Sequence, residues 1–232
     1  MILDIEFVYI RGGWFEMGDI FNEGSESEKP VHLIYIKSFY LSKYLITNAQ
    51  YMQFVKETGY EKPKSVLKSS FSKDNQPVSG ISWIDAMKFC EWLKAKTGKD
   101  IRLPSEAEWE FAARNRGKRI RYPWGNKHPT YELANHSALI WHTTEVGRYP
   151  PNELGIYDMA GNVWEWCLDW FDKNYYSKSP IHNPKGPTCG ILKVLRGGSW
   201  LDSPRSIRTT HRSFNLPTYR GCINGFRVCF CE

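Results

Sequence analysis

Residues 155–170 read GIYDMAGNVWEWCLDW, and two related strings follow, VLRGGSW at 194–200 and GFRV at 225–228. Gly161 and Gly197–Gly198 suit tight turns or the close approach of two backbones. The large rings of the three strings would fill the core beneath those turns; they are Trp164, Trp166, Trp200 and Phe226. We expect Arg227 to be a structural anchor whose guanidinium donates to backbone carbonyls. Helical periodicity largely disappears after residue 118, so the second half is predicted to be irregular β structure.

The first half of the chain carries clear helix signals. Thr47, Ser82 and Ser105 each precede a helical stretch, and the latter two open capping boxes. The predicted helices follow them, at about 48–58, 83–97 and 106–114. Apolar and polar residues alternate in 6–19 around a Gly-Gly bend, and 29–47 is rich in β-forming residues, whereas the polar stretch 60–80 reads as a loop. Helices followed by irregular β structure predict an α+β fold.

Composition excludes several classes of protein. The formal net charge of +6 comes from interspersed acids and bases, so no arm for nucleic acid is expected. No stretch is apolar enough for membrane insertion or for a signal peptide, and we expect a soluble chain, either cytoplasmic or carried on a virion. The cysteines contain no CxxC pair, which argues against a zinc site and favours free thiols buried in the core.

Several strings occur in a diagnostic order: FEMGD at 15–19, RLPSEAEWEFAAR at 102–114, YPWGN at 122–126, then the three strings quoted above. Together they resemble the formylglycine-generating enzyme, or sulfatase-modifying factor, family from about Glu6 to Val228. The resemblance implies a variant of the C-type lectin fold, with paired N- and C-terminal strands, two main helices, small twisted sheets and much ordered loop. With no repeat, linker or low-complexity tract, one domain over 1–232 is expected.

The resemblance does not extend to the family's oxidase chemistry. Those oxidases bind copper through two cysteines a few residues apart, downstream of the Gly-Gly-Ser-aromatic motif, and convert a substrate cysteine to formylglycine. The matching stretch here, 201–215, contains no cysteine. Because Cu(I) requires soft thiolate ligands, neither copper nor this activity is expected. Placing Cys222 in that role would move it past Pro217 and Arg220.

The resemblance also implies a structural calcium site. The family's second calcium loop matches 157–166, where Asp158 and Glu165 would supply carboxylate oxygens and Gly161 and Val163 backbone carbonyls. Such oxygen ligands suit a hard cation. The alternative is a tight turn in which Glu165 accepts hydrogen bonds from backbone N–H groups.

The residues after Trp200 have an unusual composition. Between 201 and 231 there is no Lys, Glu, Gln, Met or Trp. A strand-rich segment disfavours some of these types. However, all of them share a genetic property, since none has a codon ending in cytosine and none can arise when the adenines of an AAC codon are randomised. One branch of this fold family is diversified in that way by retroelements, between GGSW and GFR. The sequence resembles such a variable protein.

We therefore predict a variable ligand-binding region at 200–227, in which Ser206, Arg208, Arg212, Pro217 and Arg220 form a fixed scaffold. The predicted binding positions carry mixed surface residue types, as in a paratope; they are Leu201, Asp202, Arg205, Ile207, Thr209, Thr210, His211, Phe214, Asn215, Leu216, Thr218, Tyr219, Gly221, Cys222, Ile223 and Asn224. The expected ligand is a protein or glycan at a cell or virus surface. The alternatives are an oxidoreductase of the formylglycine-generating type with altered chemistry, and a scaffold or regulatory domain.

Overall fold

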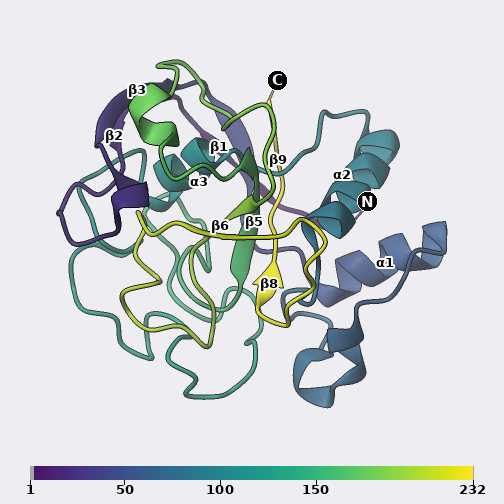
Figure 1. The fold of residues 1–232 in the computed structure, drawn as a ribbon. Coiled ribbons are helices and arrows are strands. Elements are labelled where there is room, and N and C mark those ends of the chain that lie inside the picture. The colour runs from purple at the N-terminus through teal and green to yellow at the C-terminus, as the bar shows by residue number, and fades with distance from the viewer. Residues whose placement is uncertain (1–2, 232) are drawn as a thin grey trace.

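The computed structural model describes residues 3–231, and its order of elements is α+β, as predicted. The α-helices are α1 (Asn48–Thr58), α2 (Trp83–Thr97) and α3 (Glu106–Ala113). Short 3-10 helices are η1 (Glu26–Glu28), η2 (Lys64–Leu67), η3 (Ser69–Phe71) and η4 (Tyr175–Lys178). The strands are β1 (Phe7–Ile10), β2 (Gly13–Met17), β3 (His32–Ile36), β4 (Phe39–Ser42), β5 (Trp164–Trp170), β6 (Lys193–Arg196), β7 (Ser213–Asn215), β8 (Asn224–Gly225) and β9 (Cys229–Phe230). Most of 114–163 is ordered loop, as Figure 1 shows.

The strands form small sheets. One has the order β1-β4-β9, a second consists of β2 and β3, and a third has the order β7-β6-β5-β8. The N- and C-terminal strands thus share a sheet without pairing directly, because β4 lies between them and pairs antiparallel with both. This corrects the expected direct pairing of the terminal strands.

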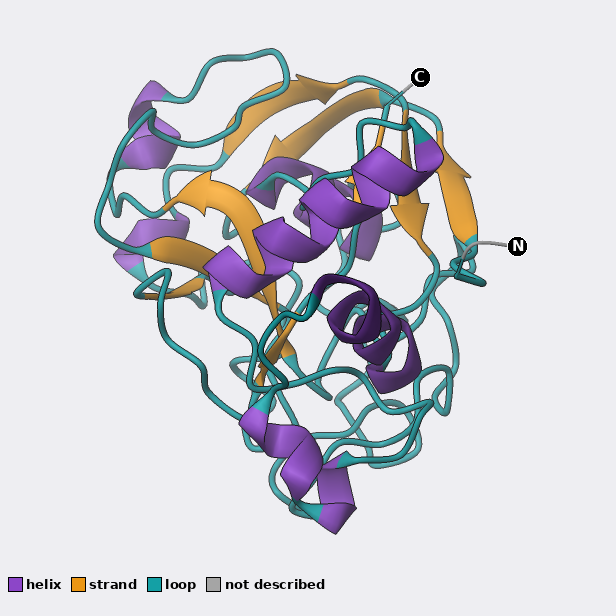
Figure 2. Cartoon of the chain, turned by 90° about the vertical axis from the view of Figure 1, so that its right-hand side faces the viewer, coloured by secondary structure: helices purple, strands orange, loops and turns teal. Residues whose placement is uncertain are grey.

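All three predicted helices are confirmed, and each begins with a capping box. The side chains of Thr47, Ser82 and Ser105 accept from the backbone N–H three residues later, and the residue at that position returns a bond to the cap. Left-handed Gly59 and Gly98 end α1 and α2. Both long helices lie on the same side of the molecule, beside the sheets (Figures 1 and 2).

The predicted aromatic core is confirmed. Trp164 and Trp166 on β5, Trp200 and Phe226 are all buried. The indole N–H of Trp166 donates to the Ile81 carbonyl at 2.7 Å, which joins β5 to the residues preceding α2. These rings therefore fix the position of α2 relative to the third sheet.

The cysteines are all free, but the prediction that they are buried holds for only part of them. Cys90, Cys167 and Cys229 are buried, whereas Cys189, Cys222 and Cys231 are exposed. The exposed thiols lie in loops or beyond the last strand, where no second layer covers them. Among residues 3–231, no helix has the length and apolar character needed to cross a membrane.

Candidate functional site

The segment 200–227 begins at a tight turn after β6. Gly197 and Gly198 have φ values of 90° and 71°, in the left-handed region that disfavours other residues. A Cβ on Gly198 would lie 2.5 Å from Cγ2 of Ile207, so the turn packs directly against the segment that it introduces. The two glycines therefore determine where the segment leaves the sheet.

Arginines attach the segment to three other elements. The pairs are Arg208 with Glu28 of η1 (3.0 Å), Arg212 with Glu106 of α3 (2.7 Å) and Arg220 with Asp85 of α2 (2.7 Å). Arg208 and Arg212 are buried, while Arg220 is exposed. These were three of the predicted scaffold positions, and their contacts explain why a change there would disturb the fold.

The anchor at α3 belongs to a buried charge network. Glu106 accepts from Arg212 (2.7 and 2.8 Å) and from Arg196 (3.1 Å). Arg196 also donates to Glu110 (2.6 Å), which accepts from Arg114 (2.8 Å). Burial alone would raise the pKa of Glu106, but the guanidinium groups of Arg212 and Arg196 hold that pKa below its usual value. The network thus holds the middle of the segment by charged hydrogen bonds.

Many of the predicted binding positions reach the surface. Those with exposed side chains are Leu201, Arg205, Phe214, Leu216, Thr218, Tyr219 and Cys222, and those half-buried are Asp202, His211, Asn215 and Ile223. The exposed residues fall in two stretches, 201–205 and 214–222, on either side of the buried residues 207–210 and 212. The structure therefore separates residues that can meet a ligand from residues that hold the segment.

The remaining predicted binding positions are buried, which corrects their assignment to the surface. Ile207, Thr209, Thr210, Gly221 and Asn224 have little or no exposed area. Ile207 packs in a small apolar cluster. The amide and hydroxyl of Thr209 donate to the backbone carbonyls of residues 121 and 120, respectively. The hydroxyls of Thr209 and Thr210 face inward because their acceptors, the Ile120 carbonyl and the Glu28 carboxylate, come from distant parts of the chain.

Two of the half-buried positions have internal partners. Asp202 accepts from the backbone N–H of Ser199 at 3.0 Å and from its hydroxyl, so its carboxylate shapes a turn. Nδ1 of His211 lies 3.7 Å from Glu28. Burial lowers the pKa of His211 to about 4, although the charge of Glu28 acts against this shift. His211 is therefore neutral at pH 7.

A neighbouring loop adds exposed apolar residues that the sequence analysis missed. The amides of Ser137 and Ala138 donate to the carbonyls of Asp202 and Trp200, which ties 137–141 to the start of the segment. Leu139, Trp141 and Leu201 are 55%, 69% and 46% exposed, and we call them the tryptophan patch. Ser137, Ala138 and Trp141 all have positive φ, which requires support from surrounding structure. The signal in the sequence was the apolar triplet LIW inside a polar loop.

A second group of exposed apolar residues lies on and after β7. Phe214, Leu216 and Tyr219 are all exposed, and we call them the strand patch. The ring of Phe214 lies 4.3 Å from that of Phe171, and β7 is an edge strand that pairs only with β6 in the described chain. In Figure 1 this yellow part of the segment runs toward α2 before turning into β8.

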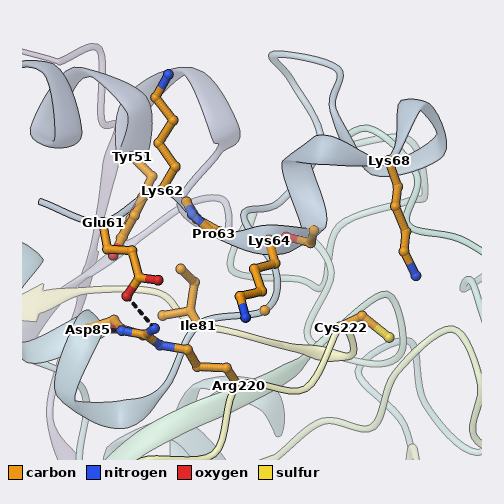
Figure 3. Close-up of a pocket in the computed structure, with 12 residues that line it drawn as sticks. Tyr51, Glu61, Lys62, Pro63, Lys64, Lys68, Ile81, Asp85, Arg220 and Cys222 are labelled. Atoms are coloured by element: carbon orange, nitrogen blue, oxygen red, sulfur yellow. Dashed lines mark hydrogen bonds and ion pairs between the residues drawn. The ribbon is translucent and has the colours of Figure 1, made fainter.

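The end of the segment borders a pocket of about 280 Å³. The helical side of the molecule contributes Ile81, Tyr51 of α1 and Asp85 of α2 to its lining. The segment contributes Arg220 and Cys222 (Figure 3). Its remaining wall is the stretch 61–68, which includes η2. The pocket therefore lies where the predicted binding region meets the helical side of the molecule.

The residues predicted to bind calcium are brought together, but their carboxylates already have partners. Both oxygens of Glu165 accept from Arg227, at 2.6 and 3.0 Å, and both side chains are fully buried. Arg227 also donates to the carbonyls of Ser42 and Tyr157, which confirms its predicted anchor role. Asp158 accepts from the amide of Gly147 at 2.8 Å, and burial raises its pKa to about 6.

Both carboxylates of this donor set are already engaged by protein donors. A calcium site needs several oxygens free to face one point, whereas Glu165 is committed to a guanidinium and Asp158 to an amide. Gly161 lies in a turn: its φ is 77°, and its amide donates to the carbonyl of Gly197. Val163 is buried in the same turn. No cluster of His, Cys, Asp or Glu in 3–231 is arranged to hold a metal ion. The calcium site stays a prediction.

Comparison with known proteins places this geometry in context. A family model described as the sulfatase-modifying factor enzyme 1-like domain matches residues 4–230. The chain is 33% identical to a formylglycine-generating enzyme of Streptomyces coelicolor, over 95% of this chain and 87% of that enzyme. It is 36% identical to a protein of Chlamydia pneumoniae named serine/threonine-protein kinase pkn1, over 96% of this chain but only 37% of that protein.

A solved structure shows the same fold. Treponema denticola variable protein 1 superposes with a TM-score of 0.88, over 100% of this chain and 98% of its own, at 24% sequence identity. This likeness supports the predicted C-type lectin-like fold. The chain spans 37% of the length of the first chlamydial relative, so the relative contains further sequence outside the matched region.

Proposed function

Because the chain belongs to the sulfatase-modifying factor enzyme 1-like family but has no cysteine in 201–215, we propose that it is a non-catalytic recognition protein. Its scaffold is C-type lectin-like, and its binding surface is the exposed part of 201–222 with the adjoining tryptophan patch. One observation carries the proposal: the buried pairs of Arg208 and Arg212 hold the middle of the segment, while exposed side chains lie on both sides of it, within 201–205 and 214–222.

The physics of binding favours such an arrangement. Ordering a flexible loop on binding costs free energy, and a loop already fixed by the protein avoids much of that cost. Arg208 and Arg212 hold the segment from below, and the glycine turn determines its start. Exposed aromatic side chains such as Trp141 and Tyr219 supply large contact areas with few rotatable bonds. The target would be a protein or glycan on a cell or virus surface.

The proposal includes diversification of this surface by a retroelement. The absence of Lys, Glu, Gln, Met and Trp from 201–231 supports it. The structure sharpens it, because only exposed positions can vary without disturbing the core. Substitutions at exposed sites usually change stability by less than about 0.5 kcal/mol, whereas changes in a packed core cost more.

The DNA beside the gene tests the diversification. We expect a near-repeat of the codons for 200–227, differing at adenines and accompanied by a reverse transcriptase gene. The differing adenines should fall in codons for exposed residues such as Leu201, Leu216 and Tyr219, and should spare buried Ile207 and Thr209. Ordinary substitutions spread evenly over exposed and buried codons, with no repeat nearby, would contradict diversification without touching the recognition role.

An oxidation assay tests the non-catalytic assignment. We expect no conversion of cysteine to formylglycine when the protein is incubated with copper and a peptide containing CxPxR, because no thiol pair lies where the oxidases have theirs. The Streptomyces coelicolor enzyme is the positive control. Turnover above the rate of free copper would favour the alternative, an oxidoreductase with altered chemistry.

A further inference from the structure

The pocket beside Arg220 has an excess of positive charge. Lys62, Lys64 and Lys68 line it together with Arg220, against the carboxylates of Glu61 and Asp85. Four cations and two anions leave a formal charge of +2. Within residues 3–231, no ion pair involves any of the three lysines, whereas both carboxylates are bound to Arg220. The excess charge is therefore not balanced by the protein.

Arg220 is fixed in place and still has free donors. Its Nε and one terminal nitrogen donate to Asp85 at 2.7 and 2.8 Å, and its other terminal nitrogen donates to Glu61 at 2.6 Å. A guanidinium has five N–H groups, one on Nε and two on each terminal nitrogen. The three bonds use the Nε–H and one N–H of each terminal nitrogen, so one N–H on each terminal nitrogen stays free. Such a pair can bind two oxygens of one anion.

Further hydrogen bonds hold the Asp85 carboxylate in its position beside Arg220. It also accepts from the amide of Ser82 at 2.9 Å, as part of the cap of α2, and from the hydroxyl of Tyr60 at 2.8 Å. Burial alone would raise the pKa of Asp85, but the bonds from Arg220, Ser82 and Tyr60 hold it below its usual value. The carboxylate therefore stays ionised and keeps Arg220 oriented.

Lys64 is the second cation that faces the pocket beside Arg220. Figure 3 shows its ammonium group directed toward the side of the pocket where Arg220 lies, whereas those of Lys62 and Lys68 point away. Lys62 and Lys68 would then act through their field and not by contact. Tyr51 and Ile81 supply an apolar floor, and a cavity of about 280 Å³ suits a small molecule or a single group of a larger one.

We propose that this pocket is a binding site for a compact dianion, such as a phosphate monoester or a small dicarboxylate. Lys64 and the two free N–H groups of Arg220 bind its oxygens, and two negative charges match the formal charge of the pocket. The pocket borders the proposed recognition surface and shares Arg220 and Cys222 with it, but it requires only a small anion and no macromolecular target. Either proposal can therefore fail alone.

Calorimetric titration of the whole chain at low ionic strength tests the site, because salt screens exposed charges. The probes are inorganic phosphate and glutarate, with neutral glutaramide as the uncharged match for glutarate. We expect at least one dianion to bind and glutaramide not to bind. Binding of phosphate alone assigns a phosphate-type ligand, and binding of glutarate alone assigns a dicarboxylate.

Lys64→Gln should weaken the binding about tenfold or more, since it removes one charged hydrogen bond. Lys127→Gln is the matched control, because Lys127 is exposed, does not line the pocket and loses the same charge. Its affinity should equal that of the unmodified protein. The proposal is overturned if neither dianion binds at up to about 10 mM, or if both variants weaken binding equally.

Discussion

Glu106→Gln is expected to lower the free energy of unfolding by about 3–5 kcal/mol, the usual cost of removing one partner from a buried ion pair. Glu106 is buried, and its carboxylate accepts from Arg196 and Arg212. A neutral amide would leave Arg212 without its carboxylate partner in the core, while Arg196 would keep Glu110, which also pairs with Arg114. Urea unfolding at pH 7 measures the loss, and hydrogen exchange of 208–216 should accelerate because Arg212 no longer holds the segment.

Glu16→Gln is the matched control, since Glu16 pairs with Arg119 at 2.7 Å on the surface. An exposed pair contributes less than about 1 kcal/mol. The low pKa of Glu106 adds a second readout. The stabilisation that ionised Glu106 provides is present at pH values above the ordinary carboxyl pKa and is lost as the pH falls. The difference in unfolding free energy between the unmodified protein and Glu106→Gln should therefore narrow in acid. Equal losses for both variants would show that the buried network does not anchor the segment.

Asp169→Asn is expected to change the pH dependence of stability. Burial, with the nearby charge of Glu106, raises the pKa of Asp169 from its ordinary value of 3.8 to about 8. Between these values the folded protein holds a proton that the unfolded chain has released, so this group makes stability fall with rising pH, by about 1.4 kcal/mol per pH unit. Asparagine is neutral at every pH and can still accept from the amide of Glu106, as Asp169 does at 2.9 Å.

The variant should therefore gain about 3 kcal/mol relative to the unmodified protein between pH 5 and pH 7, as measured by urea unfolding. Asp158, whose pKa is also raised, titrates in both proteins and cancels. Lys193 is buried with its pKa lowered to about 8, so its opposite effect lies at higher pH. Asp172→Asn is the control, because the hydrogen bond from Lys178 lowers the pKa of Asp172. Parallel stability curves for Asp169→Asn and the unmodified protein would contradict a protonated Asp169.

Local signals in the sequence were sufficient for the helices. Each helix start depends on a cap and on a residue three positions later, as with Ser105 and Glu108, and such contacts are local in the sequence. The aromatic core strings were also readable, because Trp166 and Phe226 are too large and apolar to remain in water. Arg227 could be recognised as an anchor, although its carboxylate partner could not be named.

The sequence by itself thus determined the α+β class, the helix starts, the family and the absence of a thiol pair in 201–215. Only the tertiary structure decided which side chains of 201–224 face outward, because Thr209 is buried by backbone some 90 residues earlier and Arg208 by Glu28, 180 residues away. The tertiary structure likewise brings the loop of Trp141 beside Leu201, and it pairs Glu165 with Arg227, 62 residues away in the sequence. A segment without regular periodicity carries no local record of such contacts, since they depend on where distant parts of the chain meet.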